Sequence, residues 1–386
     1  MKVLFWQFDT VSEDGIEHAF RYMNVELVIH KEQIKNVNFD QTCVDTLTNY
    51  LNSTSFSCVF TVNYYPIISR VCEIYKIPYL SWIVDCPFNA LYSNTISNSV
   101  NRIFLFDYAQ YQKFYPKNPT GIFYQPLGAD IAAFDTYIPS PKERENYSCD
   151  ISFLGSLYNK RHFEFESKLP PYLKGYCQGM MDSQALIYGY NFLEDALPLE
   201  ICEEFKKYYP LKLPIDFEED LVGLVANSFL SRKITHTERI KTLNYISQNH
   251  SVHLYTSDPI DNIPNIINKG FVEYGEKMAY VFKCSKINLN MTSKAIKTGL
   301  PLRIFDILGC QGFLITNFQS EIPEYFEDGI DLVTYESLPD LEEKINYYLQ
   351  HEEERLKIVK NGYEKVKNHY TFVHCLAQII RTVWSL

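Results

Sequence analysis

The segment KCSKINLNMTSKAIKTGLPLRIFDILGCQGFLIT, residues 283–316, decides the fold of this chain. Its pattern predicts a buried strand at 287–290, a polar loop that closes on residues 298–301, a helix, and a second apolar strand at 312–315. A strand, a glycine-containing turn, a helix and a strand form the βαβ unit of a parallel sheet. Such sheets bind ligands beyond the carboxyl ends of their strands.

The loop and the first turn of this helix carry groups that suit an anion. Backbone N–H groups around Gly299 can face a phosphate, and the positive end of the helix dipole favours it. Arg303 would add a fork of donors, and Asp306 would accept hydrogen bonds from a sugar diol. These groups point to a nucleotide diphosphate, although α/β proteins also have Gly-Pro turns and charged helix starts for purely structural reasons.

Composition describes a globular protein of more than one domain. The 386 residues suit two α/β domains, and 46% hydrophobic with 22% charged residues excludes disorder. A net charge of −11 and a pI near 5.4 argue against a nucleic-acid partner or an anionic membrane surface. The 30 Tyr and 26 Phe suit both a packed core and sugar binding.

The cysteines and the apolar runs indicate the compartment. None of the ten cysteines occurs in a C-x-x-C pair, and most lie in apolar runs, so we expect buried thiols in a reducing compartment. The apolar run at the start, MKVLFWQFDT, is too short for a signal peptide, and no run approaches the roughly 18 apolar residues of a membrane helix. The sequence predicts a soluble, cytoplasmic protein without an integral membrane segment.

Residues 1–145 alternate between short apolar strands and helical stretches, which predicts a doubly wound parallel sheet. Residues 139–145 are polar and proline-bearing, as in an interdomain linker. The expected strands are 3–8, 25–29, 58–62, 79–84, 102–106 and 121–125. The residues that their ends would project toward one edge are Asp9, Asn63, Asp85, Asp107 and Gly128.

A second domain, residues 146–365, is expected to begin with a strand that runs into Gly155 and Ser156. Lys160 and Arg161 follow, and they would either neutralise a phosphate or form a solvated surface. Helical stretches dominate from about 163 to 232 and predict a helical insertion, with a helix at 186–193. The α/β pattern then resumes with a helix at 237–248 and strands that include 251–255, 270–274 and 332–335. A helix at 352–370 is expected to break near Gly362, and a final helix within 366–386 is expected to pack back toward the N-terminal domain.

Two Rossmann-like doubly wound domains that face a cleft form the GT-B architecture. Residues 146–365 resemble the group 1 glycosyl transferase domain of CgeB-type proteins through DISFLGSLY (150–158), TERI (237–240), SKINLN (285–290) and GLPLRIFDI (299–307). The N-terminal portion resembles the domain of unknown function that precedes it, chiefly through IPYLSWIVDCP (77–87). The resemblance covers most of the chain and is weakest over the helical insertion.

This resemblance implies a bacterial, hexosyltransferase-like enzyme. It would move a sugar from a nucleotide diphosphate donor, with a UDP-sugar favoured, to a hydroxyl-bearing acceptor, and it would need no cofactor. Asp306 would hold the ribose hydroxyls, and Tyr274 would stack on the base. Asp306 stands where many relatives have Glu, and Thr298 stands where many retaining enzymes have a second acidic residue. The implied donor-binding residues are Gly155, Ser156, Lys160, Arg161, Tyr274, Thr298, Gly299, Leu300, Arg303 and Asp306.

The resemblance also implies chemistry without a metal, because GT-B enzymes stabilise the departing diphosphate with a helix N-terminus and basic side chains. Asp258 and Asp261 are interpreted as structural turn residues. An inverting enzyme would need a general base, and Asp85 is the first candidate because Trp82 and Pro87 would give it apolar surroundings. The alternatives are a capping role for Asp85, a base among Asp9, Asp14 and His18, or a retaining mechanism that needs no base.

Two other functions remain open. A sugar-nucleotide epimerase of the same fold would use the same donor site without an acceptor. A glycan- or partner-binding protein would keep the fold and lose the chemistry. The sequence leaves open the sugar, the acceptor (a protein, a cell-surface polymer or a small molecule), the role of the insertion and the formation of a homo-oligomer.

Overall fold

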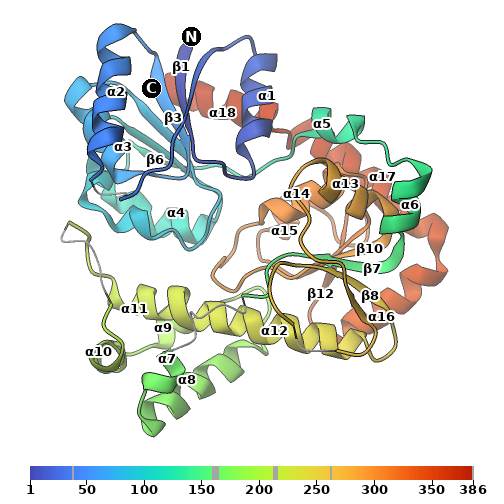
Figure 1. Ribbon diagram of the computed structural model, residues 1–386. Helices are drawn as coiled ribbons and strands as arrows, with labels where there is room; N and C mark the ends of the chain where they lie inside the picture. Colours follow the sequence, from blue (N-terminus) through green and yellow to red (C-terminus); the bar gives the residue numbers. More distant parts are fainter. Residues whose placement is uncertain (37–38, 159–164, 212–215, 261–262, 385–386) are drawn as a thin grey trace. The chain divides into compact units, whose positions relative to one another are not determined.

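The structure is a computed structural model that describes residues 1–36, 39–158, 165–211, 216–260 and 263–384. The chain forms two compact units, and each contains one six-stranded parallel sheet (Figure 1). The described parts of the first unit lie within residues 1–130, 212–220 and 370–386, and those of the second within 131–211 and 221–369. The predicted class, α/β with two doubly wound parallel sheets, is confirmed.

The first sheet has the strand order β2-β1-β3-β4-β5-β6. Its strands are β1 (Lys2–Gln7), β2 (Glu26–Lys31), β3 (Cys58–Val62), β4 (Tyr79–Trp82), β5 (Asn101–Leu105) and β6 (Ile122–Tyr124). The helices of this unit are α1 (Glu13–Tyr22), α2 (Gln41–Ser53), α3 (Pro66–Tyr75), α4 (Tyr108–Phe114) and α18 (Phe372–Trp384), with short 3₁₀ turns η1 (Asn89–Tyr92), η2 (Asn94–Ser97) and η3 (Tyr115–Lys117).

Both faces of this sheet are covered, which explains why its strands are apolar at successive positions. On one face, Leu4 and Trp6 pack into a core with residues of α2 and α3. On the other face, the ring of Phe5 contacts Phe20 of α1 and Phe60 of β3, at centroid distances of 6.2 and 5.2 Å.

Helix α18 belongs to the first unit although it follows the second unit in the chain. The amide of Ala129 donates to the oxygen of Tyr370 (2.9 Å), and the amide of Phe372 donates back to Ala129 (3.0 Å). The ring of Phe372 contacts Trp82 at 5.8 Å. A Cβ added at Gly15 of α1 would lie 2.6 Å from the same ring, so glycine allows α1 to approach α18.

The second sheet has the order β12-β11-β10-β7-β8-β9. Its strands are β7 (Cys149–Leu154), β8 (Val252–Tyr255), β9 (Ile266–Asn268), β10 (Ser285–Asn290), β11 (Leu314–Asn317) and β12 (Val333–Tyr335). The helices outside the insertion are α5 (Ile131–Thr136), α6 (Pro141–Tyr147), α12 (Ser231–Ile246), α13 (Glu276–Cys284), α14 (Leu302–Gly309), α15 (Ile322–Tyr325), α16 (Leu338–Gln350) and α17 (Glu352–His369).

The helical insertion has a hydrophobic core of its own. The rings of Phe165, Phe205 and Phe229 lie 5.4 to 5.8 Å apart within this core. Its elements are α7 (Phe165–Lys168), α8 (Pro171–Gln184), α9 (Leu193–Ala196), α10 (Leu199–Tyr208), α11 (Leu221–Gly223) and a π-helix, η5 (Leu224–Leu230), that continues into α12.

Several predicted elements differ from the observed ones. The expected linker contains helix α6, because Ser140 and Glu143 form a capping box at its start. The expected helix at 186–193 is absent, since α8 ends at Gln184 and α9 begins at Leu193. Helix α17 runs unbroken through Gly362, where an added Cβ would collide with the backbone oxygen of Asp331. This glycine serves close packing and does not end the helix.

Candidate functional site

The loop after β7 is held by a buried carboxylate. Asp258, 3% exposed, accepts hydrogen bonds from the hydroxyl of Ser156 (2.6 Å) and from the amide of Leu157. The amide of Gly155 donates to the oxygen of Tyr255 (3.1 Å). The structure therefore ties the predicted phosphate loop to the end of β8. Lys160 and Arg161 lie outside the described residues.

Arg239 connects this loop to the loop after β10. It lies on α12, is 8% exposed, and donates to the backbone oxygens of Ser156 and Met291. Its guanidinium lies 5.3 Å from the ring of Phe153 and 5.1 Å from the ring of Tyr158. The guanidinium of Arg239 therefore links the loop after β7 to the loop after β10. Sequence reasoning gave Arg239 no role, although it lies in the TERI stretch.

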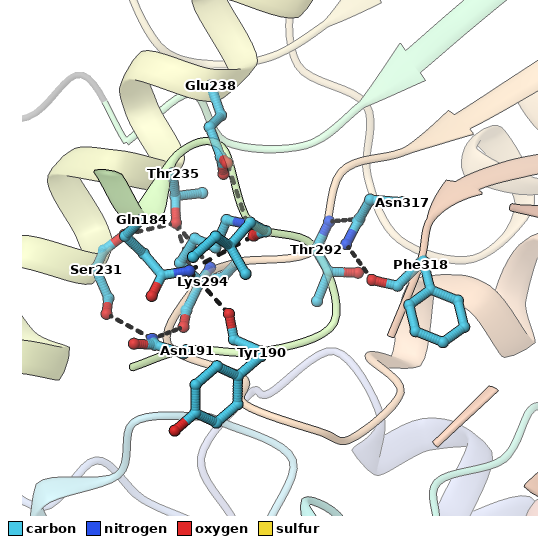
Figure 2. Close-up of polar contacts among 12 residues, drawn as sticks. Gln184, Tyr190, Asn191, Ser231, Thr235, Glu238, Thr292, Lys294, Asn317 and Phe318 are labelled. Atoms are coloured by element: carbon cyan, nitrogen blue, oxygen red, sulfur yellow. Dashed lines mark hydrogen bonds and ion pairs between the residues drawn. The ribbon is translucent and has the colours of Figure 1, made fainter. Parts of the chain in front are cut away.

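A second cation, Lys294, lies at the centre of the polar cluster in Figure 2. Its Nζ is 3.1 Å from Oε1 of Glu238 and donates to the oxygen of Ile187 (2.7 Å). Its amide donates to the hydroxyl of Thr235 (3.0 Å), and its oxygen accepts from Asn191 (2.6 Å). The loop after β10 is therefore held against the insertion and α12.

The Glu238–Lys294 pair is removed from water. Lys294 is 9% exposed, and the Glu238 side chain is 17% exposed. Burial raises the pKa of Glu238 to about 7, although Lys294 acts in the opposite direction. Sequence reasoning missed this pair, whose members are 56 residues apart. A titratable group with such a pKa in a polar cluster is a common feature of functional sites.

The turn before α14 is partly buried, and hydrogen bonds from the segment after β11 hold its backbone oxygens. The oxygen of Thr298 accepts from the amide of Glu321 (3.3 Å), and that of Gly299 accepts from Gln319 (3.3 Å). Leu300 is 3% exposed, and Pro301 precedes the first helical residue. The predicted role of this turn as a source of backbone donors to a phosphate stays a prediction.

Asp306, Tyr274 and Arg303 are brought together by the fold. Asp306 is 1% exposed and accepts a hydrogen bond from the hydroxyl of Tyr274 (2.8 Å). Nη1 of Arg303 lies 3.5 Å from the other oxygen of this carboxylate and also contacts the sulfur of Met278. Burial raises the pKa of Asp306 to about 6, while Arg303 and Tyr274 act in the opposite direction.

The predicted strand at 270–274 is wrong. The strand of this region is β9 (Ile266–Asn268), and Tyr274 lies in the following loop. Gly270 and Gly275 have φ of 77° and 99°, values that glycine adopts readily, and they bend the chain on both sides of Tyr274. Tyr274 thus reaches Asp306 from a loop and not from a strand end.

In the first unit, Asp85 follows β4 and is exposed. Its carboxylate accepts from the side-chain amide of Asn63 (2.8 Å), whose oxygen accepts from the amides of Val84 and Asp85. Trp82 is completely buried, and the apolar flanking by Trp82 and Pro87 stays a prediction for Asp85. Its role as a base stays a prediction.

Of the other candidate bases, His18 has a defined carboxylate partner. Its Nδ1 lies 2.8 Å from Oδ2 of Asp130, which is 8% exposed, while the imidazole is 55% exposed. Asp9 and Asp14 are exposed. Within the described part of the chain, no group of three or more His, Cys, Asp or Glu side chains could hold a metal ion. No helix of the described residues is long and apolar enough to span a bilayer.

The fold places the chain among proteins of GT-B architecture. The structure of Anabaena HepE in complex with UDP and glucose is similar to this chain, with a TM-score of 0.54 and 12% sequence identity. The alignment covers 100% of both chains. Sucrose-phosphate synthase from Thermosynechococcus elongatus gives a TM-score of 0.58 at 9% identity, covering 100% of this chain and 99% of the synthase. At these identities the likeness shows the fold alone, and the predicted GT-B fold is confirmed.

Residues 234–381 match a family model described as "Glycosyl transferase-like". This match contains most of α12, the loop after β10 and α14, and therefore most of the site described above. No curated protein matches the chain. The family match and the fold together support a glycosyltransferase. The narrower resemblance to CgeB-type proteins stays a prediction.

Proposed function

We propose that this chain is a glycosyltransferase that moves a sugar from a nucleotide diphosphate, with a UDP-sugar favoured, to a hydroxyl-bearing acceptor. The observation that carries the proposal is the buried Asp306 on α14, with Tyr274 and Arg303 bound to it, in the segment that matches the glycosyl transferase-like family. The donor class is supported by Anabaena HepE, whose structures hold UDP with glucose and UDP-glucose.

In this proposal the donor lies along the carboxyl edge of the second sheet. Backbone groups of residues 298–301 and the loop at Gly155 would face the diphosphate, helped by the positive end of α14. Asp306 is so buried that a ribose would meet Tyr274 and Arg303 first. Direct contact with the ribose therefore requires the loop at 270–275 to move. If the loop does not move, Asp306 acts by positioning Tyr274 and Arg303, which would then bind the nucleotide.

The charge of the departing diphosphate would be balanced without a metal ion. The N-terminus of α14 and the guanidinium of Arg303 are the groups that we assign to this task. An inverting reaction also needs a base, which we assign to Asp85, with His18 as the second candidate because Asp130 holds its ring. A retaining reaction would need neither.

Thermal unfolding with nucleotides and nucleotide sugars, with and without EDTA, tests the proposal. A ligand at 100 times its Kd stabilises the folded state by about 2.7 kcal/mol, which is easily measured. We expect stabilisation by UDP or another nucleoside diphosphate that survives EDTA. Loss of this effect in EDTA would refute metal independence, and no effect of any nucleotide would favour a non-catalytic binding protein.

A second assay separates transfer from epimerisation. The donor that stabilises the protein is incubated with the enzyme alone, and its sugar is then analysed. Conversion of the donor into an isomer without any acceptor would identify an epimerase and contradict the transferase proposal. An unchanged sugar or slow release of the nucleotide agrees with transfer to an acceptor that is still to be supplied.

A further inference from the structure

Four tyrosines form one surface of the first unit. Tyr108 and Tyr111 lie on α4, Tyr115 begins the 3₁₀ turn after it, and Tyr124 ends β6. We call these residues the tyrosine surface. Tyr108 is 43% exposed and Tyr115 is 40% exposed, while Tyr111 and Tyr124 are partly buried. Tyr111 also packs against the core of the first unit, whereas Tyr108 and Tyr115 present much of their rings to solvent.

The rings contact one another in sequence. Tyr108 lies 5.6 Å from Tyr111 and 5.3 Å from Tyr124, and Tyr111 lies 5.3 Å from Tyr115. Spacings of three and four residues place Tyr108, Tyr111 and Tyr115 on one side of the helical segment. The contacts restrain each ring, so little conformational freedom is left to lose when a ligand binds.

This surface begins at the carboxyl edge of the first sheet, where parallel sheets bind ligands. Tyr108 directly follows Asp107, the N-cap residue after β5, and Tyr124 is the last residue of β6. Nε2 of Gln110 lies 3.7 Å from the sulfur of Cys86, so α4 also contacts the residue that follows Asp85. The tyrosine surface therefore begins at the same edge of the sheet as Asp85, the carboxylate that we assign as the base.

The lysines of α4 and of the turn after it carry their charge on the opposite side. Lys113 pairs with Asp220, and Lys117 pairs with Glu218, so both cations are neutralised by residues of the same unit. A polyanion such as a nucleic acid, or an anionic membrane, binds through clustered unneutralised cations. The tyrosine surface instead offers ring faces and phenolic hydroxyls, which match the apolar C–H faces and the hydroxyls of a neutral sugar.

We propose that the tyrosine surface binds a carbohydrate acceptor, a neutral sugar or oligosaccharide. This inference rests on the proposed function, because it names the class of molecule that receives the transferred sugar. The sugar rings stack on Tyr108 and Tyr124, and the phenolic hydroxyls hydrogen-bond to the sugar hydroxyls. The acceptor hydroxyl is thereby held at the edge of the sheet that carries Asp85.

Calorimetric titration with a panel of neutral oligosaccharides of glucose, galactose and N-acetylglucosamine tests this proposal. We expect the wild type to bind at least one of them, and Tyr108→Ala and Tyr115→Ala each to weaken that binding about tenfold. Tyr108→Phe keeps the ring and should stay within about threefold of the wild type. Tyr22→Ala, which removes a 77% exposed tyrosine of α1, is the matched control and should bind as the wild type does.

Several outcomes would overturn the proposal. These are no binding of any panel member by the wild type, equal binding by the alanine variants, or an equal loss in the Tyr22→Ala control. A change of oligomeric state in the alanine variants, with sugar binding intact, would instead make this surface an interface between copies of the chain. Stabilisation by UDP is measured in the same proteins, so failure of donor binding is distinguished from failure of this surface.

Discussion

The hydroxyl of Tyr274 donates a 2.8 Å hydrogen bond to the carboxylate of Asp306 and thereby joins the loop before α13 to helix α14. Tyr274 was predicted to stack on the base of the donor, and Asp306 was predicted to hold the ribose hydroxyls. The fold makes them a pair in which the phenol stabilises the charged form of a buried acid. With a pKa of about 6, Asp306 is ionised at neutral pH and neutral in mild acid.

Replacing Asp306 by Ala should weaken donor binding, because a hydrogen bond to a charged group contributes roughly 1.5–3 kcal/mol. The expected loss is about tenfold to a hundredfold in the Kd for UDP, measured by calorimetry. Tyr274→Phe keeps the ring and removes the hydroxyl, so we expect a smaller loss. Asp182→Ala, at an exposed position of α8, is the control. Unchanged affinity in a folded Asp306→Ala protein would exclude Asp306 from the site.

The Glu238–Lys294 pair predicts a pH dependence of stability. Because the pKa of Glu238 rises from 4.5 to about 7 on folding, its contribution is fully present below pH 4.5 and is lost as the pH rises toward 7. Glu238→Gln does not titrate there, so the wild type should lose about 2 to 3 kcal/mol relative to it between pH 5 and pH 8. Urea unfolding across this range measures the difference. A constant difference would mean that Glu238 is ionised throughout.

Asp85→Asn distinguishes the two mechanisms. If the enzyme inverts, this variant should lose transfer while its affinity for UDP is unchanged, because the amide cannot accept the proton of the acceptor. His18→Gln is the parallel variant, since it tests the second candidate base. Initial rates and UDP binding are measured for both. Full transfer by both variants would remove the two residues from the mechanism and favour retention.

Gly362→Ala should lower the free energy of unfolding by about 1 to 3 kcal/mol, because the new methyl group would meet the backbone oxygen of Asp331 and Cδ2 of Leu308. Gly179→Ala on α8 is the matched control, since nothing lies within 4 Å of its Cβ position. There the helix propensity of alanine should raise stability by about 0.5 to 1 kcal/mol. Urea unfolding of both variants checks the prediction, and it fails if both respond alike.

Local patterns predicted the elements that carry strong periodicity. Strand β3 has the predicted bounds, 58–62, because its continuous apolar run is unambiguous. Strand β9 was misplaced, since it is a three-residue edge strand, whereas the apolar Phe271 and Val272 lie in a loop bent by two glycines. The Ser140–Glu143 capping box was visible in the sequence, yet the nearby prolines suggested a linker.

Of the residues in the candidate site, the sequence predicted only those that lie in a recognisable local motif. Asp306 and Arg303 follow a Gly-Pro turn, which is a local signal. Arg239 and Glu238 have none, because they lie on a long helix whose contacts come from loops more than 50 residues away. Their importance follows from burial and partners, which only the folded chain defines. Nothing in the two separate segments of sequence indicates that Lys294 forms an ion pair with Glu238.

The return of α18 to the first unit has a consequence for biosynthesis. The ring of Phe372 covers Trp82 and touches Gly15, yet the ribosome makes this helix only after the whole second unit. Helix α1 covers part of this face through Phe20, but the part of the N-terminal sheet around Trp82 must stay uncovered while the rest of the chain is translated. Until α18 is synthesised and packs there, these exposed apolar side chains can bind chaperones or pack against the wrong segments. The chain order of this fold therefore increases the risk of misfolding during synthesis.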